Sequence, residues 1–298
     1  MTKSFRGTYT VLITPYDERG DIDAAALAAL VEWQIAEGVH GLIPLGSTGE
    51  FLSLSNDEKT LVAEAVIRAS AGRAPVLIGA GAEDTREVVR LSREAERLGA
   101  DGVMIIPPFY STPTEDELFV HYRTVGEAIS IPIMIYNNPT TANVDLKPAF
   151  VERLARIDNC RYIKESTLEV TRVRDIMRLC GDRMSVFGGI LGFESFAEGA
   201  AGWVAVPSNV APGPFSRLYT LVAEQERLSE GRALYLHWLP IIEAVFGQAY
   251  VAGTKALLRH MGFPAGAPRP PRLPVSSDED QRLRGLVAEF GLKFPASA

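Results

Sequence analysis

The chain has 298 residues, of which 47% are hydrophobic and 22% are charged, and its formal net charge is -7 at pH 7. This composition is typical of a globular protein and excludes collagen-like and disordered chains. The acidic balance, with no cluster of Lys and Arg interleaved with aromatic residues, argues against nucleic acid as a partner.

Targeting segments and cysteine chemistry are also constrained by the sequence. Residues 1–20 contain no apolar run typical of a signal peptide, and no later stretch approaches the roughly 20 apolar residues that span a bilayer. We therefore expect a cytoplasmic protein with no membrane partner.

Cys160 and Cys180 lack C-x-x-C spacing, so we expect reduced thiols in or near the core and no zinc site.

From Thr10 onward, short apolar runs alternate with longer segments of helical periodicity. The eight runs are T-V-L-I (10–13), G-L-I-P-L (41–45), P-V-L-I-G (75–79), G-V-M-I-I (102–106), P-I-M-I-Y (132–136), R-Y-I-K (161–164), M-S-V-F (184–187) and W-V-A-V (203–206). They are apolar almost throughout, without the polar/apolar alternation of a half-exposed sheet. Such runs are typical of parallel strands that helices cover on both faces.

The segments between the runs carry helix start and stop signals. A capping residue stands three positions before a carboxylate at Ser55 with Glu58, Asp84 with Glu87, and Thr114 with Glu117. Gly38, Gly72 and Gly99 follow the last apolar turns, where a left-handed residue ends a helix.

Eight strand–helix units predict an α/β fold, a (β/α)8 TIM barrel over residues 7–228, in preference to an open doubly wound sheet. Residues 229–298 are expected to form a C-terminal helical extension of the same single domain. Its predicted helices lie near 231–246, 249–261 and 279–290, with the Pro-rich segment 267–274 between the last two.

In a barrel of this kind the carboxyl ends of the strands build the active site. Lys164 is expected at the last position of strand six, where an amine among apolar walls loses its proton readily and can attack a carbonyl to form an imine. Pairing with Glu165 or with a neighbouring loop carboxylate is the ordinary structural alternative. Tyr136 ends the adjacent strand five, so its phenol should lie near Lys164 and could move protons; the alternative is a packed rim tyrosine.

Two glycine-flanked loops are candidate anion sites. Ser47 and Thr48 lie in G-S-T-G (46–49), which offers two hydroxyls and successive backbone N–H groups to a carboxylate or phosphate. Gly188–Gly189 follow strand seven, where phosphate sites of such barrels often lie, but no Lys or Arg accompanies them. A phosphosugar isomerase is accordingly disfavoured.

Metal-dependent and hydrolytic mechanisms lack the side chains that they need. The histidines, His40, His121, His237 and His260, fall outside the predicted strand ends and are interpreted as surface or packing residues. No G-x-S-x-G elbow is present.

Several strand-end motifs together resemble a known family, the dihydrodipicolinate synthase / N-acetylneuraminate lyase family of class I, Schiff-base-forming lyases. The motifs are L-I-T-P-Y-D (12–17), R-G-D-I-D (19–23), L-G-S-T-G-E (45–50), P-P-F-Y (107–110), I-Y-N-N-P (135–139), I-K-E-S (163–166) and G-W-V-A-V-P-S-N-V (202–210). They occur in the order and spacing of the family.

The resemblance implies a role for each matching residue. Lys164 would form an imine with pyruvate or another 2-keto acid, and Tyr136 would be the general acid/base. Ser47 and Thr48 would bind the substrate carboxylate, and Tyr110 would reach the proton relay of a neighbouring subunit through Ser47. It further implies a homotetramer, built as a dimer of dimers, and no metal or other cofactor. Carbonyls near Gly188 and Val204 would line the pocket, with the register at Gly188–Gly189 open by one residue.

The loop after strand five departs from the family pattern. Dihydrodipicolinate synthases carry an arginine there for the carboxylate of the aldehyde substrate, whereas this chain has Thr141. A hydroxyl cannot imitate a bidentate guanidinium. Thr140, Thr141 and Asn143 would suit hydroxyl or amide groups better, which makes Thr141 a candidate substrate-binding residue.

The sequence therefore predicts a class I lyase, a pyruvate-type aldolase or dehydratase acting on a small hydroxylated 2-keto acid. Two alternatives stay open. One is dihydrodipicolinate synthase itself, 4-hydroxy-tetrahydrodipicolinate synthase, which joins pyruvate to aspartate semialdehyde in lysine biosynthesis. The other is a barrel that binds a 2-keto acid without turning it over.

Overall fold

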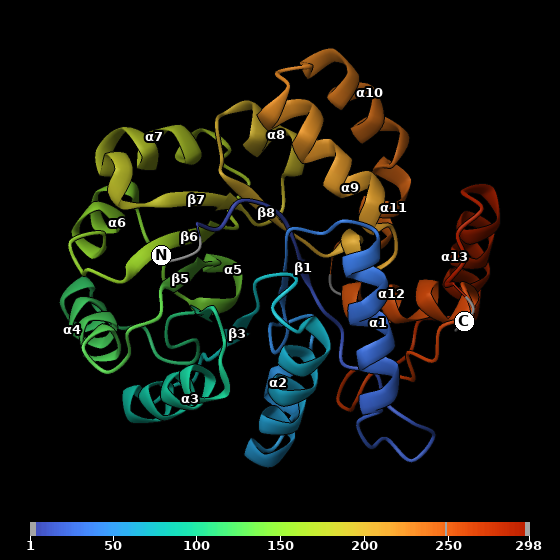
Figure 1. The fold of residues 1–298 in the computed structure, drawn as a ribbon, viewed down its shortest axis with the longest axis horizontal. Helices are drawn as coiled ribbons and strands as arrows, with labels where there is room; N and C mark the ends of the chain where they lie inside the picture. The colour runs from blue at the N-terminus through green and yellow to red at the C-terminus, as the bar shows by residue number, and fades with distance from the viewer. Residues whose placement is uncertain (1–3, 248, 296–298) are drawn as a thin grey trace.

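Eight parallel strands form a ring that helices surround in the computed structural model, which describes residues 4–247 and 249–295 (Figure 1). The strands are β1 (Gly7–Val11), β2 (Gly41–Ile43), β3 (Leu77–Gly79), β4 (Gly102–Ile105), β5 (Ile133–Asn137), β6 (Cys160–Glu165), β7 (Ser185–Gly188) and β8 (Gly202–Ala205). The predicted TIM barrel is confirmed.

The strands pair in the order β2-β1-β8-β7-β6-β5-β4-β3. Between β2 and β3 a single parallel bridge joins Leu42 to Val76, and Gly79 N–H donates to Pro44 O at 3.1 Å. This contact closes the ring. The carboxyl ends of all strands consequently face one mouth.

Several strand boundaries differ from the sequence-based ranges. The first run was expected at 10–13, but β1 is Gly7–Val11; the second was expected at 41–45, but β2 ends at Ile43. Leu45 adopts φ 59°, a left-handed backbone conformation that cannot continue a strand. Continuously apolar runs have no alternation to fix a boundary, so errors of this size are expected.

Helices surround the strands, and short helical segments lie in the loops that follow the strands (Figure 1). They are α1 (Ala24–Ala36), η1 (Phe51–Ser53), α2 (Asn56–Ser70), α3 (Thr85–Leu98), α4 (Glu115–Gly126), α5 (Pro139–Ala142), α6 (Pro148–Leu154), α7 (Thr171–Cys180), η2 (Gly181–Arg183), α8 (Gly192–Ala197), η3 (Pro207–Asn209), α9 (Pro212–Tyr219) and the π-helical turn η4 (Thr220–Glu224). Both cysteines are buried free thiols, as expected.

Two of the three predicted capping boxes are confirmed, at the N-termini of α2 (Ser55 with Glu58) and α4 (Thr114 with Glu117). At α3, Asp84 is the N-cap, but its carboxylate accepts from Arg86 N–H, and Glu87 instead pairs with Arg90. An arginine within reach thus competes successfully for the carboxylate of Glu87.

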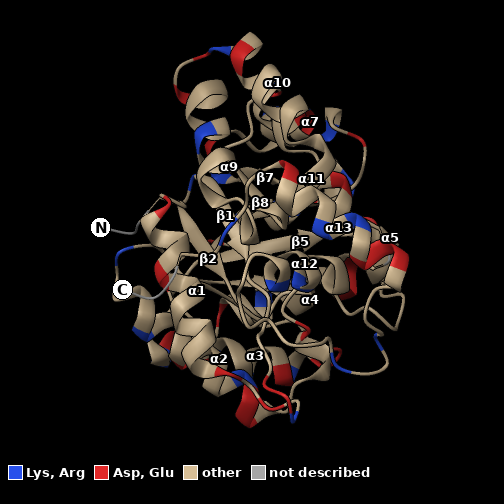
Figure 2. Ribbon diagram, turned by 90° about the vertical axis from the view of Figure 1, so that its right-hand side faces the viewer, with Lys and Arg blue, Asp and Glu red and all other residues tan. Residues whose placement is uncertain are grey.

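Four helices follow the barrel: α10 (Leu228–His237), α11 (Leu239–Ala244), α12 (Tyr250–His260) and α13 (Ser277–Glu289). The helix expected over 231–246 is broken at Trp238, because Pro240 has no N–H and stands in the first turn of α11. After α13 the chain returns to α1, where the Phe294 ring packs on Trp33 with ring centroids 5.1 Å apart. Acidic and basic residues lie interspersed on the outer helices (Figure 2).

Candidate active site

Lys164 and Tyr136 face each other on neighbouring strands. In the parallel register of β5 and β6, Tyr136 is the direct partner of Lys164, and Asn137 is the partner of Glu165. The Lys164 amine lies 3.9 Å from the centroid of the Tyr136 ring. Both strands run one residue further than the sequence indicated, so neither residue is the last of its strand.

Lys164 does not use its neighbour Glu165 as a counter-ion. Side chains alternate along a strand, and the Glu165 carboxylate instead accepts from Asn137 Nδ2 at 2.9 Å and from Thr167 N–H at 2.8 Å. Lys164 is 5% exposed, and no ion pair involves it among the residues that the structure describes. The simple structural explanation for this lysine, pairing with Glu165, is therefore wrong.

The phenol of Tyr136 has a hydrogen-bond donor beside it and a lowered pKa. Asn138 Nδ2 donates to its oxygen at 2.9 Å. Burial raises the pKa of Tyr136, but the positive charge of Lys164, followed by the hydrogen bond from Asn138, outweighs this and leaves the pKa below its usual value. A phenol with a lowered pKa exchanges its proton more readily near neutral pH.

The loop after β2 brings two hydroxyls to the same site. Thr48 is buried and Ser47 is partly exposed. Ser47 and Tyr250, the first residue of α12, line the same cavity, and Ser47 lies near enough to lower the pKa of the Tyr250 phenol slightly. Burial, followed by the nearby Tyr136, raises the pKa of Tyr250 to about 12, so this phenol keeps its proton.

A cavity of about 670 Å³ opens at this mouth of the barrel. Its lining includes most of the candidate residues, which are Ser47, Thr48, Tyr136, Thr141 and Lys164. Asn138 and Ser166, which stand in the strand-end motifs but received no role from the sequence, also line it, as do Tyr250 and Arg172, which sequence reasoning missed. After β7 the lining residues are Gly189 and Ile190, which begin one position beyond Gly188, and neither Gly188 nor Val204 is among the described residues of the wall.

Gly189 has a steric reason to be glycine. A Cβ at this position would lie 1.7 Å from the Ser166 hydroxyl, which is closer than any side chain tolerates. The glycine thus makes room for Ser166 beside Lys164 and Tyr136. A glycine directly after a strand was the only sequence signal of this close approach.

Tyr110 lies away from the cavity of its own chain and is 88% exposed. Its loop is nevertheless fixed. The Glu83 carboxylate accepts from the N–H groups of Phe109, Tyr110 and Ser111 at 2.9, 3.1 and 2.9 Å. Asn143 Nδ2 donates to Phe109 O at 2.9 Å. An ordered backbone thus presents an exposed phenol at the surface.

The only arginine among the described cavity residues is already paired. Arg172 donates from Nη1 and Nη2 to Asp145 at 2.5 and 2.8 Å, and from Nε to Glu169 at 2.8 Å. The bond to Arg172 holds the pKa of the Asp145 carboxyl well below its usual range. Thr141, in contrast, directs its hydroxyl to Asn138 O at 3.3 Å.

A second buried lysine lies outside the cavity. Lys255 is fully buried, and its amine is 2.7 Å from Glu50 Oε1 and 3.9 Å from the centroid of the Tyr16 ring. Burial lowers the pKa of Lys255 to about 8, against the opposing effect of Glu50. Only Lys164 combines burial with access to a cavity.

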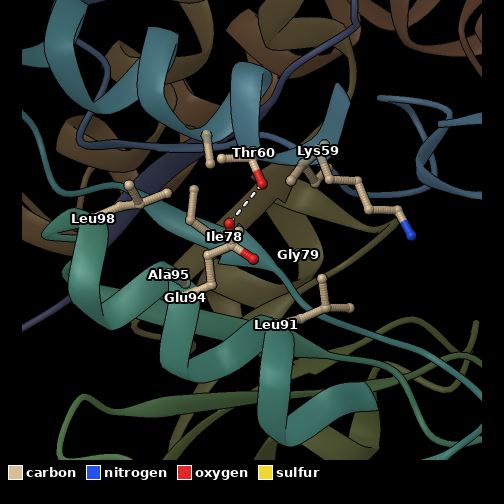
Figure 3. A pocket seen from close by; sticks show the side chains of 10 residues that line it. Lys59, Thr60, Ile78, Gly79, Leu91, Glu94, Ala95 and Leu98 are labelled. Carbon is tan, nitrogen blue, oxygen red and sulfur yellow. Dashed lines mark hydrogen bonds between the residues drawn. The ribbon is translucent and has the colours of Figure 1, made fainter. Parts of the chain in front are cut away.

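A separate cavity between α2 and α3 is too small for a substrate (Figure 3). Its volume is about 20 Å³, enough for one water molecule. Thr60 donates to Glu94 Oε1 at 2.6 Å in its wall.

The histidines pack away from the mouth, as His121 illustrates: its Nδ1 lies 2.9 Å from Thr85 Oγ1, on the outer helices. Within residues 4–247 and 249–295, no group of three or more His, Cys, Asp or Glu is arranged to hold a metal ion. In the same part of the chain, no helix has both the length and the apolar character needed to cross a membrane.

Comparison with known proteins agrees with this geometry. The model of the Dihydrodipicolinate synthetase family matches residues 4–290. The chain belongs to this family. It is therefore a class I lyase, as the strand-end motifs predicted, and not a barrel without catalytic activity.

Individual members of the dihydrodipicolinate synthetase family resemble the chain over its whole length. It is 39% identical to 4-hydroxy-tetrahydrodipicolinate synthase of Nitrobacter hamburgensis, over 97% of each chain, and 36% identical to that of Rhodopseudomonas palustris, over 98% of each. Among solved structures, dihydrodipicolinate synthase of Acinetobacter baumannii complexed with pyruvate has a TM-score of 0.94 and 30% identity, over 97% of this chain and 100% of that one.

Proposed function

We propose that this lyase is a pyruvate-type aldolase in which the Lys164 amine attacks the keto carbon of the substrate. Water leaves, and a C=N bond joins Lys164 to the former keto carbon. Loss of a C3 proton gives an enamine, whose C3 adds to an aldehyde carbon; the reverse sequence cleaves a 4-hydroxy-2-keto acid. Because the imine itself accepts the electron pair, the reaction needs no metal or dissociable cofactor.

The other site residues have proposed roles in the same cycle. Tyr136 gives a proton to the oxygen of the new alcohol and receives it back in the cleavage direction. The hydroxyls of Ser47 and Thr48 hold the substrate carboxylate. Tyr250 is the phenol that reaches Ser47 within the same chain, which supports a role in orienting that hydroxyl.

The observation that carries this proposal is the pairing of Tyr136 with Lys164 inside one cavity. Reduction with borohydride in the presence of pyruvate should add one pyruvate-derived group to the Lys164 peptide, detected by mass spectrometry. Lys255, which is closed off from the cavity, provides an internal control and should stay unmodified. Folded protein that gives no adduct at Lys164 would contradict the proposal.

A second candidate is 4-hydroxy-tetrahydrodipicolinate synthase, the activity for which the relatives in N. hamburgensis and R. palustris are named. Thr141, in place of an arginine, is the observation against it. A coupled assay with pyruvate and aspartate semialdehyde separates the two, since turnover at the rate of an ordinary biosynthetic enzyme would favour the synthase.

We also propose a cytoplasmic homotetramer, a dimer of dimers, in which Tyr110 contacts the site of a neighbouring subunit. The ordered loop and exposed phenol of Tyr110 support such a contact. Sedimentation of the purified protein, with a Tyr110→Asp variant beside it, tests the assembly.

A further inference from the structure

The cavity around Lys164 has walls of two different kinds. Its hydroxyl and amide groups come from the loops after β2, β5 and β6. The residues that supply them include Ser47, Thr48, Asn138, Thr140, Thr141, Ser166 and Thr167. The segments after β7 and β8, together with α11 and the turn after it, supply mainly apolar side chains, and Leu168 adds one more from the loop after β6. These are Leu168, Ile190, Val206, Ile242, Val245 and Phe246.

Two of these apolar side chains are unusually exposed for their size. Leu168 is 65% exposed and Phe246 is 55% exposed, although both border the site that contains the reactive amine. Exposed apolar surface costs free energy unless something covers it, and a concave, mostly apolar wall is typical of small-molecule sites.

The charges of the wall leave no cation for a second substrate carboxylate. Apart from Lys164, the charged residues among the described part of the wall are Arg172, Asp145 and Glu169. Arg172 bridges both carboxylates, and Lys147 Nζ lies 2.5 Å from the same Asp145. The pairs balance each other, so an anionic group placed there would have to displace a bound carboxylate.

Thr141 does not compensate for the missing cation. Its hydroxyl is directed to the Asn138 carbonyl, and a neutral hydroxyl offers a carboxylate one hydrogen bond at most. The cavity, at about 670 Å³, also exceeds what pyruvate alone would fill. Size, polarity and charge all point to a bulky neutral partner.

We infer that the second substrate is an aldehyde with an uncharged apolar substituent, alkyl or aryl, seated against Leu168 and Phe246. In the condensation direction the enamine C3 forms a C–C bond to the aldehyde carbon, and the aldehyde oxygen takes a proton to become a hydroxyl. Water then releases the product from Lys164. The product is a 4-hydroxy-2-keto acid with an apolar group on C4. This inference rests on the proposed imine chemistry.

The test compares aldehydes at a fixed pyruvate concentration, with borohydride trapping of pyruvate in parallel. Benzaldehyde is the apolar probe, and aspartate semialdehyde and glyceraldehyde are the anionic and hydroxylated ones. We expect kcat/KM for benzaldehyde to be at least about tenfold higher than for aspartate semialdehyde or glyceraldehyde. A Lys164→Met variant gives the background rate of the uncatalysed reaction. The product is identified by mass spectrometry.

The outcomes separate this inference from the function on which it rests. In one outcome, pyruvate is trapped normally at Lys164 while the enzyme prefers aspartate semialdehyde or glyceraldehyde, or does not turn over benzaldehyde. Either result would overturn the apolar assignment and leave the imine mechanism intact. Absence of trapping in folded protein would instead overturn the mechanism itself.

A matched pair of variants tests the position of the apolar group. Leu168→Ala removes a wall residue, whereas Leu236→Ala removes a leucine of similar exposure, 52%, on α10 outside the cavity. We expect Leu168→Ala to raise KM for benzaldehyde about fivefold without changing the trapping of pyruvate. Leu236→Ala should leave both unchanged. Equal effects of the two variants would contradict the placement.

Discussion

At the scale of single residues, two lysines show that burial alone does not make a nucleophile. Lys255 is the more deeply buried, with its pKa lowered to about 8, yet its amine is held by Glu50 and has no cavity beside it. Lys164 faces Tyr136 and an open cavity. Access to the cavity, and a phenol nearby, distinguish the proposed nucleophile Lys164 from the structural lysine Lys255.

The contact of Tyr250 with Ser47 predicts an effect on catalysis. Tyr250→Phe removes the hydroxyl that we propose orients Ser47, so kcat should fall about tenfold, with little change in KM for pyruvate. Steady-state kinetics from pH 6 to pH 10 measures both. Tyr219→Phe, a buried tyrosine of α9, is the matched control and should behave as the native protein does.

Tyr110→Phe serves as the competing test, because the family resemblance implies that Tyr110, and not Tyr250, is the phenol that joins the proton relay through Ser47. If Tyr110→Phe abolishes activity while Tyr250→Phe is neutral, the relay depends on the neighbouring subunit, and the role of Tyr250 is refuted.

At the scale of elements, the start of α2 combines a local signal with a distant one. Ser55 and Glu58 form the capping box that the sequence predicts. Glu58 also pairs with Arg269, 211 residues away, at 2.5 Å. The bond to Arg269 is the main cause that lowers the pKa of Glu58 to about 2. One carboxylate therefore both caps a helix and holds the C-terminal segment to it.

This double use predicts a pH-dependent loss of stability in Glu58→Gln. A carboxyl whose pKa is lowered by folding stabilises the protein above its unfolded pKa of about 4.3, and that contribution disappears as pH falls toward 2. At pH 6 the variant should lose about 1 kcal/mol of unfolding free energy, and the difference should shrink near pH 2.5. Urea denaturation measures it. Glu64→Gln, on the same helix, is the control; a pH-independent difference would speak against the pairing.

At the scale of the whole molecule, the buried pair of Lys255 and Glu50 joins α12 to the loop after β2. Glu50 Oε2 also accepts from Arg269 N–H at 2.9 Å. Because the same loop carries Ser47 and Thr48, the C-terminal extension helps to support the proposed carboxylate site. Removing either partner alone would leave the other charge buried without a counter-ion, which is strongly destabilising.

Lys255→Met should consequently be strongly destabilising, since it leaves the Glu50 carboxylate buried without its cation. We expect a loss of about 3 kcal/mol in unfolding free energy by urea denaturation. The double variant Glu50→Gln/Lys255→Met should recover part of this loss. As a control, Lys293→Met at an exposed position should change the unfolding free energy by less than about 0.5 kcal/mol. A double variant less stable than Lys255→Met would contradict the explanation.

The sequence by itself determined the features that depend on neighbours along the chain. Continuous apolar runs specify buried parallel strands, capping residues specify helix starts, and the strand-end rule places Lys164 and Tyr136 at one mouth. Strand boundaries were less certain, because a run without alternation does not mark its own end.

Only the tertiary structure decided which distant residues meet. Tyr250 reaches Ser47 across about 200 residues, Arg269 reaches Glu58, and Lys255 reaches Glu50. Arg172 could have been a free ligand for an anion, but Asp145 and Glu169 neutralise it. Local periodicity carries no information about such pairs, since side-chain charge and reach allow many partners until the closed barrel brings one of them within bonding distance.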